Sequence, residues 1–98
     1  MKNIIENINK AFESRVRLGI MSILLVNHEV DFNELKDRLD LTDGNLASHI
    51  SALEKLEYII VYKEFVGKKT KTTYKVSRLG KKEFNEHLKA LEKLISKK

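Results

Sequence analysis

The fold is decided by residues 32–58, which read FNELKDRLDLTDGNLASHISALEKLEY. Leu35 and Leu39 fall on one face of a first predicted helix, and residues 40–42 follow as a tight turn. The apolar residues of the next segment recur at the spacing of an amphipathic helix. These residues are Leu46, Ile50, Leu53 and Leu56. Two short amphipathic helices joined by such a turn predict a helix-turn-helix.

The composition changes after residue 57, and the sequence that follows predicts a β-hairpin. Residues 58–62 are rich in β-branched and aromatic side chains. Residues 72–76 show the side-chain alternation that is typical of a half-buried strand. Gly67 lies between the two segments, where a hairpin turn is expected. Ser77 then provides the N-cap of a last helix, which we expect over about residues 78–96.

The N-terminal part is expected to be helical. Ile4, Ile8 and Phe12 recur at helical spacing, and a further apolar pattern continues to about Asn27. This pattern predicts one long helix or two consecutive helices. A short strand is expected next, within residues 29–32.

The complete order of elements predicts a mainly α protein with a small β-hairpin (α+β), that is, a winged helix-turn-helix with N- and C-terminal dimerisation helices. The 98 residues fit one domain, residues 1–98. Within it, we expect the second helix of the motif at about residues 42–57 and the hairpin, or wing, at about residues 58–77.

The composition excludes several classes of protein. The chain has no Cys, which removes disulfides, thiolate nucleophiles and Cys-based zinc sites. Its longest apolar stretch, residues 19–26, is far shorter than the roughly 18 residues that cross a bilayer, and no export signal is recognised. The chain also lacks a phosphate-binding glycine loop and a convincing Ser/His/acid arrangement. We therefore expect a cytoplasmic protein that is not an enzyme and has no cofactor, no metal and no membrane partner.

Charge is distributed unevenly along the chain. Residues 1–57 carry 7 Lys or Arg and 10 Asp or Glu, a net charge of −3, whereas residues 58–98 carry 12 and 4, a net charge of +8. The overall charge of +5 therefore conceals a basic second half. Such asymmetry indicates an anionic partner, with nucleic acid or a membrane surface as the usual candidates.

Together with the wing segment FVGKKTKTTY at residues 65–74, the stretch at residues 32–59 resembles the small winged-helix transcriptional regulators related to the MarR and ArsR groups. The resemblance covers about residues 14–95, and the segment TDGNL at residues 42–46 is among its most specific parts. It implies a dimeric regulator of transcription that binds double-stranded DNA. The helix at about residues 42–57 would enter the major groove, and the wing would lie on the backbone or in the minor groove.

Two departures from the family pattern bear on function. Asp40 stands at the turn position where Gly is common, and Asp adopts the left-handed conformation at modest cost. The wing carries Lys where related chains often have Arg. Because Lys lacks the bidentate fork of Arg, we expect the wing to contact phosphates rather than base edges.

One face of the second helix is predicted to point away from the apolar stripe and toward DNA. This face presents Gly44, Ser48, Ser51 and Lys55, with Asn45 on its flank. Asn45 has the groups for a bidentate pair with adenine, and a Gly allows close approach of the helix. The family motif adds Thr42 at the start of the helix. The alternative interpretation is an ordinary solvated helix face.

The histidines and Arg17 allow more than one interpretation. His49 lies near the edge of the apolar stripe, where a packed and hydrogen-bonded histidine is common, while the family motif favours a DNA contact equally. His87 could bind a metal together with Glu83 or Glu86, but an exposed helix salt bridge or simple solvation is favoured over a zinc site. Arg17 could contact phosphate or pair with a nearby acid.

The hairpin gives the strongest electrostatic signal. Five lysines lie within 13 residues that contain one acid, Glu64; they are Lys63, Lys68, Lys69, Lys71 and Lys75. We expect Lys68, Lys69, Lys71 and Thr72 to contact DNA, with a log–log salt dependence of roughly −0.9 per phosphate contact. The alternative is an edge hairpin whose lysines protect it against aggregation.

The terminal apolar stripes predict a homodimer. They extend beyond what a winged helix needs for its core, and a second copy would cover them. The expected interface residues are Ile4, Ile8, Phe12, Leu88, Leu91 and Ile95. Two recognition helices about 34 Å apart would then bind a pseudo-palindromic operator. The alternative is a monomer whose terminal helices complete its own core.

A second class of function is a winged helix that docks a protein partner without specific DNA binding. The basic wing discriminates between the two classes, since DNA binding requires its lysines and apolar docking does not. The sequence assigns no small-molecule effector, and it leaves the operator sequence and the choice between repression and activation open.

Overall fold

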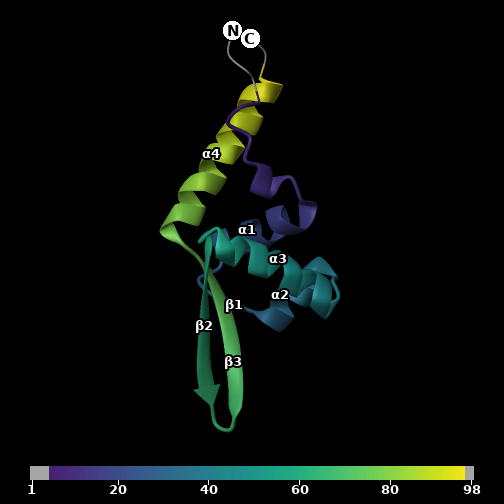
Figure 1. Cartoon of the computed structure of the whole chain (residues 1–98), viewed down its shortest axis with the longest axis vertical. Helices are drawn as coiled ribbons and strands as arrows, with labels where there is room; N and C mark the ends of the chain where they lie inside the picture. Colours follow the sequence, from purple (N-terminus) through teal and green to yellow (C-terminus); the bar gives the residue numbers. More distant parts are fainter. Residues whose placement is uncertain (1–4, 97–98) are drawn as a thin grey trace.

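The computed structural model of the chain describes residues 5–96, and its elements are labelled in Figure 1. In chain order these are the 3-10 helix η1 (Lys10–Phe12), α1 (Arg15–Val26), β1 (Val30–Asp31), α2 (Phe32–Leu39), α3 (Asp43–Lys55), β2 (Ile59–Val66), β3 (Lys69–Val76) and α4 (Arg78–Ile95). The strands form an antiparallel sheet in the order β1-β3-β2. This architecture confirms the predicted α+β winged helix-turn-helix.

Capping interactions define the two helices of the motif and the turn between them. Asp31 begins α2 with a capping box, in which its side chain accepts the Glu34 N–H and the Glu34 carboxylate accepts the Asp31 N–H. Asp40 ends α2 in the left-handed conformation that the sequence predicts for it, with φ 52° and ψ 58°. Thr42 begins α3, and its hydroxyl oxygen accepts the Asn45 N–H at 3.2 Å.

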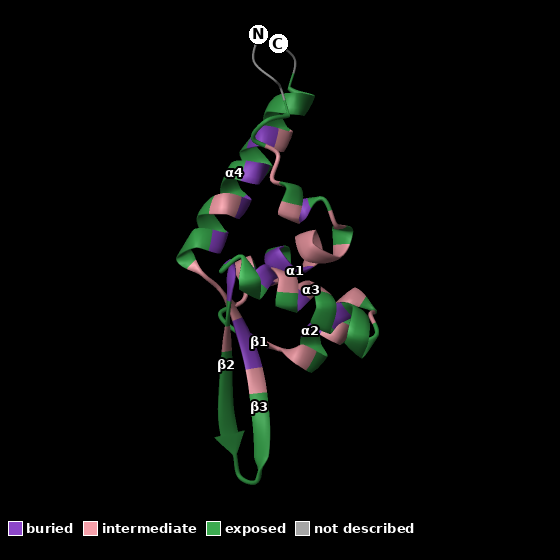
Figure 2. Cartoon of the chain, viewed as in Figure 1, coloured by how far each residue is buried: buried purple, intermediate pink, exposed green. Residues whose placement is uncertain are grey.

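The core lies where α1, α2, α3 and the root of the hairpin meet. The three helices and β1 contribute fully buried side chains to it, among them Ile20 of α1, Leu35 of α2, Leu46 and Leu53 of α3 and Val30 of β1. At the root, Val61 of β2 pairs with Tyr74 of β3, and Tyr74 pairs with Val30 on its other side. The far half of the hairpin leaves the core and is exposed along its length, as Figure 2 shows.

The predicted N-terminal helix is wrong for the described residues. Residues 5–7 form a turn, and the only helical structure before α1 in the described chain is the single 3-10 turn of η1. Asn9 and Ser14 explain the difference, because their side chains accept the N–H groups of Ala11 and Arg17 and so start two separate elements. Ile4 lies outside the described residues.

The expectation that Phe12 lies in a dimer interface is also wrong. Its side chain is only 1% exposed and belongs to the core of its own chain. The ring lies 5.4 Å from that of Tyr58 and 5.1 Å edge-on from that of Phe84, measured between centroids. The 3-10 turn directs the ring inward between Tyr58 and α4, so that the Phe12 side chain has no exposed surface for a second copy to cover.

Helix α4 runs away from the body at the end opposite the hairpin tip, with residues 5–9, here called the N-terminal segment, along its side (Figure 1). Its buried face carries Gly80, Phe84, His87 and Ala90. Leu88, Leu94 and Ile95 are exposed on the rest of the helix, and Leu91 is half-buried. No helix within residues 5–96 has the length and apolar character needed to cross a membrane.

Candidate DNA-binding surface

Helix α3 has one buried face and one exposed face, as the sequence predicts. Leu46, Ile50 and Leu53 hold the helix on the core. The predicted contact residues lie on the exposed part of the helix and its N-cap; they are Thr42, Gly44, Asn45, Ser48, Ser51 and Lys55. These residues are therefore available to a ligand, while the buried apolar residues fix the orientation of the helix on the core.

The beginning of α3 is held by polar contacts and leaves room for close approach. Lys36 of α2 forms an ion pair with Asp43 at 2.9 Å, and the hydrogen bond to Asp43 raises the pKa of the Lys36 ammonium. Gly44 has open space around the position of a Cβ atom, so nothing in the described chain covers its backbone. The Asn45 N–H is used by the Thr42 cap, which leaves the exposed Asn45 side chain for other partners.

His49 is turned toward α1. Its Nδ1 atom accepts a hydrogen bond from Nε of Arg17 at 3.1 Å, which assigns the ring as the neutral tautomer with the proton on Nε2. Burial, and then the charge of Arg17, lower the pKa of His49 below its usual value of 6.5. Arg17 thus takes a partner that neither sequence interpretation foresaw, and His49 is a half-buried, hydrogen-bonded histidine at the side of α3.

The wing carries its lysines at an exposed tip. The turn lies at Gly67, whose φ of 68° is in the left-handed region that favours glycine, and at Lys68. Lys68, Lys69 and Lys71 are exposed, whereas Thr72 is half-buried nearer the root. The tip is therefore a compact positive surface with few competing protein contacts.

A groove of about 280 Å³ connects α3 to the wing. Ser51 and Glu54 line it from α3, and Lys63 and Thr72 line it from the hairpin. The structure therefore brings together two predicted site residues, Ser51 and Thr72, from separate parts of the motif. The groove joins the Ser51 side of α3 to the inner part of the hairpin, at Lys63 and Thr72.

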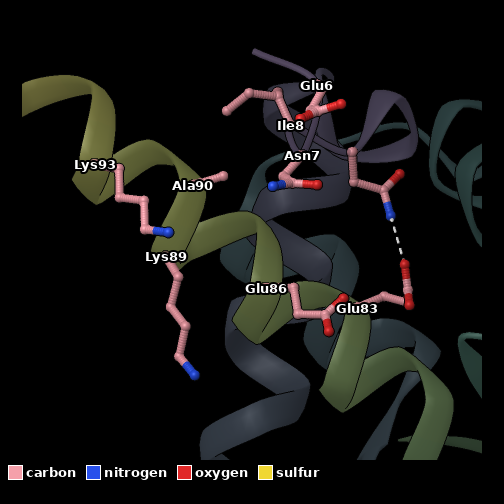
Figure 3. Close-up of a pocket in the computed structure, with 9 residues that line it drawn as sticks. Glu6, Asn7, Ile8, Glu83, Glu86, Lys89, Ala90 and Lys93 are labelled. Carbon is pink, nitrogen blue, oxygen red and sulfur yellow. Dashed lines mark hydrogen bonds between the residues drawn. The ribbon is translucent and has the colours of Figure 1, made fainter. Parts of the chain in front are cut away.

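A second pocket, of about 490 Å³, lies between the N-terminal segment and α4 (Figure 3). Ile8 lines it together with Glu86 and Lys89 of α4, and Asn9 donates a hydrogen bond to Glu83 at 3.4 Å. The lysines Lys89 and Lys93 lie on its α4 side. Within residues 5–96, no three His, Asp or Glu side chains are grouped so that they could hold a metal ion.

His87 of α4 lies near the pocket between the N-terminal segment and α4. The sequence predicts an exposed side chain for His87, but the structure buries it. It is only 3% exposed, and its Nδ1 atom accepts the backbone N–H of Asn9 at 3.0 Å. Burial lowers the pKa of His87, and the charge of Glu13 opposes this shift in part. His87 is thus a structural link between the N-terminal segment and α4.

The sequence interpretation misses two further features of the surface. Arg17 is separated from His49 by 32 residues, so helical periodicity alone could not pair them. Phe65 enters that interpretation only as the start of the wing, although its side chain is 82% exposed. The alternation of side chains along a strand could have identified Phe65, because it places Phe65 on the same face of β2 as Lys63.

The chain matches a protein family, a sequence relative and solved structures. Residues 16–95 match the family described as "Winged helix DNA-binding domain". An uncharacterized protein of Methanocaldococcus jannaschii is 34% identical over 79 residues, which cover 81% of this chain and 86% of that protein. The solved transcriptional regulator homologue protein from Pyrococcus horikoshii OT3 is 32% identical, with a TM-score of 0.76 and coverage of 92% of this chain and 94% of that chain.

A structure of reduced AbfR bound to DNA is also similar in fold. Its TM-score is 0.77 at 12% identity, with coverage of 95% of this chain and 67% of that chain. At this level of identity the likeness concerns the fold alone. The predicted resemblance to small winged helix-turn-helix regulators is confirmed by the family match and by the 32% identical regulator homologue.

Proposed function

This chain belongs to the winged helix DNA-binding domain family, and from that premise we propose that it is a transcriptional regulator that recognises a specific sequence in double-stranded DNA. Helix α3 enters the major groove, and the wing lies on the phosphate backbone beside the adjacent minor groove. The observation that carries this proposal is the groove that joins Ser51 of α3 to Thr72 of the hairpin, together with the exposed lysines at the wing tip.

Base recognition rests on the exposed side of α3. The Asn45 amide reads adenine, and Ser48 and Ser51 donate hydrogen bonds to bases or phosphates. Gly44 and the uncovered start of the helix allow its backbone to approach the groove closely. His49 contributes its Nε2–H, since its Nδ1 atom is engaged by Arg17. Lys55 and Thr42 contact phosphate at the two ends of the helix.

The wing supplies affinity that does not depend on sequence. Lys68, Lys69 and Lys71 neutralise phosphates and release counterions, and Thr72 adds a hydroxyl contact where the wing meets the groove. Because the far half of the hairpin makes no core contacts that would compete, these side chains remain available to the DNA backbone.

The regulator acts as a homodimer. Leu88 and Ile95 are exposed on α4, Leu91 lies half-buried among them, and a second copy would cover them. Ile8 lines a separate pocket with Glu86 and Lys89, so the proposed interface does not include it. A two-fold axis at this end of the molecule leaves both wings free at the other end. Two copies of α3 then reach major grooves roughly 34 Å apart, so the operator is pseudo-palindromic.

The salt dependence of DNA binding tests this function. Replacing Lys68, Lys69 and Lys71 together by Ala should weaken binding and reduce the log–log salt slope by about 0.9 for each phosphate that is no longer neutralised. A control of equal charge replaces Lys82, Lys89 and Lys93, which are exposed on α4, and should leave the slope nearly unchanged. Equal effects of both triple variants would contradict a wing-specific contact, and binding of a protein partner alone would favour a docking module.

A further inference from the structure

The wing tip carries an aromatic residue that its own fold does not use. The side chain of Phe65 is 82% exposed at the end of β2, next to the turn at Gly67 and Lys68. Burial of a large aromatic ring normally stabilises a fold, and the exposed ring of Phe65 gives this fold almost no such stabilisation. Lys63 lies on the same side of β2, and Lys68 lies in the turn that follows, a charged setting that suits a polyanion better than an apolar protein surface.

The strand register shows which way Phe65 faces. Alternate residues of a strand share one side of the sheet, so Phe65 lies on the side of Lys63 and Val61. Lys63 and Val61 line the groove whose other wall is α3. Phe65 therefore extends the α3-facing side of the hairpin outward to the tip, whereas Val66 points to the opposite side.

We propose that Phe65 enters the minor groove next to the major-groove site of α3 and packs its ring against sugar and base edges there. This inference rests on the proposed DNA-binding function and adds an apolar contact to it. The minor groove is about 6 Å wide, which admits one flat side chain but not a two-stranded hairpin. Lys68 and Lys69 then lie on the flanking phosphates and hold the ring in place.

This contact makes the wing sensitive to the floor of the minor groove. Guanine places an N2 amino group there, whereas A·T pairs present only acceptors. An inserted ring therefore favours A·T pairs under the wing and partly unstacks the adjacent base step, as apolar side chains in minor grooves do. The lysines by themselves would show no such preference, because phosphates carry no sequence information.

The first test separates the ring from the charges. Phe65→Ala should lower DNA affinity roughly tenfold, which is the range for removing an aromatic side chain that packs on a base, without changing the log–log salt slope. Val66→Ala, on the opposite side of the same strand, is the control and should change affinity less than about threefold. Thermal unfolding of each variant should match the wild type, because neither side chain belongs to the core.

The second test locates the ring on the DNA. In the segment under the wing, A·T pairs are replaced by G·C pairs or by inosine·C pairs, which lack the N2 amino group. The wild type should bind the inosine DNA more tightly than the guanine DNA, and Phe65→Ala should lose this discrimination. Equal affinity of wild type and Phe65→Ala on all DNAs would overturn the Phe65 contact alone, whereas failure of the wild type to bind any DNA would overturn the proposed function itself.

Discussion

The Nε atom of Arg17 lies 3.1 Å from the Nδ1 atom of His49, and this hydrogen bond ties α1 to the side of α3. The bond holds α3 at the boundary between its buried apolar face and its exposed face. A helix that reads a DNA groove must hold its side chains in fixed positions, and this bond restrains rotation of α3 without occupying its outer surface.

Arg17→Ala should raise the pKa of His49 toward the usual value of 6.5. Burial lowers this pKa first and the Arg17 charge lowers it further, so that removal of the guanidinium both exposes the ring to water and relieves charge repulsion. NMR titration of the His49 ring resonances in the wild type and the variant measures the change. His87, in another part of the molecule, should titrate as before, and an unchanged His49 pKa would show that the Arg17 hydrogen bond is absent in solution.

His87 should make the stability of the fold depend on pH. Its folded-state pKa lies below 6.5 through burial, so the unfolded chain takes up the proton more readily. The stabilising contribution of neutral His87 is therefore complete above about pH 6.5 and is lost as the pH falls toward the folded-state pKa. Protonation of Nδ1 would also remove the acceptor for the Asn9 N–H.

Denaturant unfolding at about pH 7.5 and about pH 5.5 checks this prediction. His87→Gln keeps an acceptor for Asn9 but does not titrate, so its free energy of unfolding should change less between the two pH values than that of the wild type. The carboxyl groups are common to both proteins and cancel in the comparison. Identical pH dependence of the two proteins would contradict the role given to His87.

Two glycines should respond to alanine with opposite signs. A Cβ atom on Gly80 would overlap the backbone carbonyl of Tyr58, which cannot move aside like a flexible side chain. Gly80→Ala should therefore lower the free energy of unfolding by about 3 kcal/mol. Gly44 has open space around it, and Gly44→Ala should leave stability unchanged or raise it by up to about 1 kcal/mol. Chemical denaturation of both variants measures the difference, and similar effects would refute the close approach at Gly80.

Leu88→Glu should dissociate the proposed dimer. Leu88 is exposed, so a carboxylate there costs the single chain little but would be buried against a second copy. Lys82→Glu introduces the same residue roughly 120° away around α4 and should leave the dimer intact. Sedimentation velocity at micromolar concentration distinguishes the species. A monomeric wild type, or a dimeric Leu88→Glu variant, would overturn the two-fold arrangement.

The parts of the fold that depend on neighbouring residues could be predicted from the sequence. The spacing of Leu46, Ile50 and Leu53 indicates the buried face of α3, and its complement indicates the exposed residues, because helical geometry relates residues three and four apart. The alternation in the hairpin and the left-handed Asp40 are local in the same sense.

Contacts between distant residues could not be predicted in this way. Phe12 has helical spacing from Ile8, yet its ring packs on Phe84 in the core. His87 is bound by Asn9, 78 residues away, and no pattern along the chain relates the two. The same holds for the candidate site. The residues on α3 and at the wing tip could be predicted from periodicity and charge. The hydrogen bond between Arg17 and His49 and the groove that joins α3 to the wing could not, because both depend on how the elements pack.

Selection of bound sequences from a random double-stranded DNA library, repeated at two salt concentrations, tests whether α3 recognises a specific DNA sequence. We expect enrichment of one pseudo-palindromic sequence whose half-sites are about one helical turn apart, with preference that persists at the higher salt concentration while total retention falls. Equal retention of all sequences at both salt concentrations would contradict recognition by α3 and leave only nonspecific attraction to the lysines of the wing.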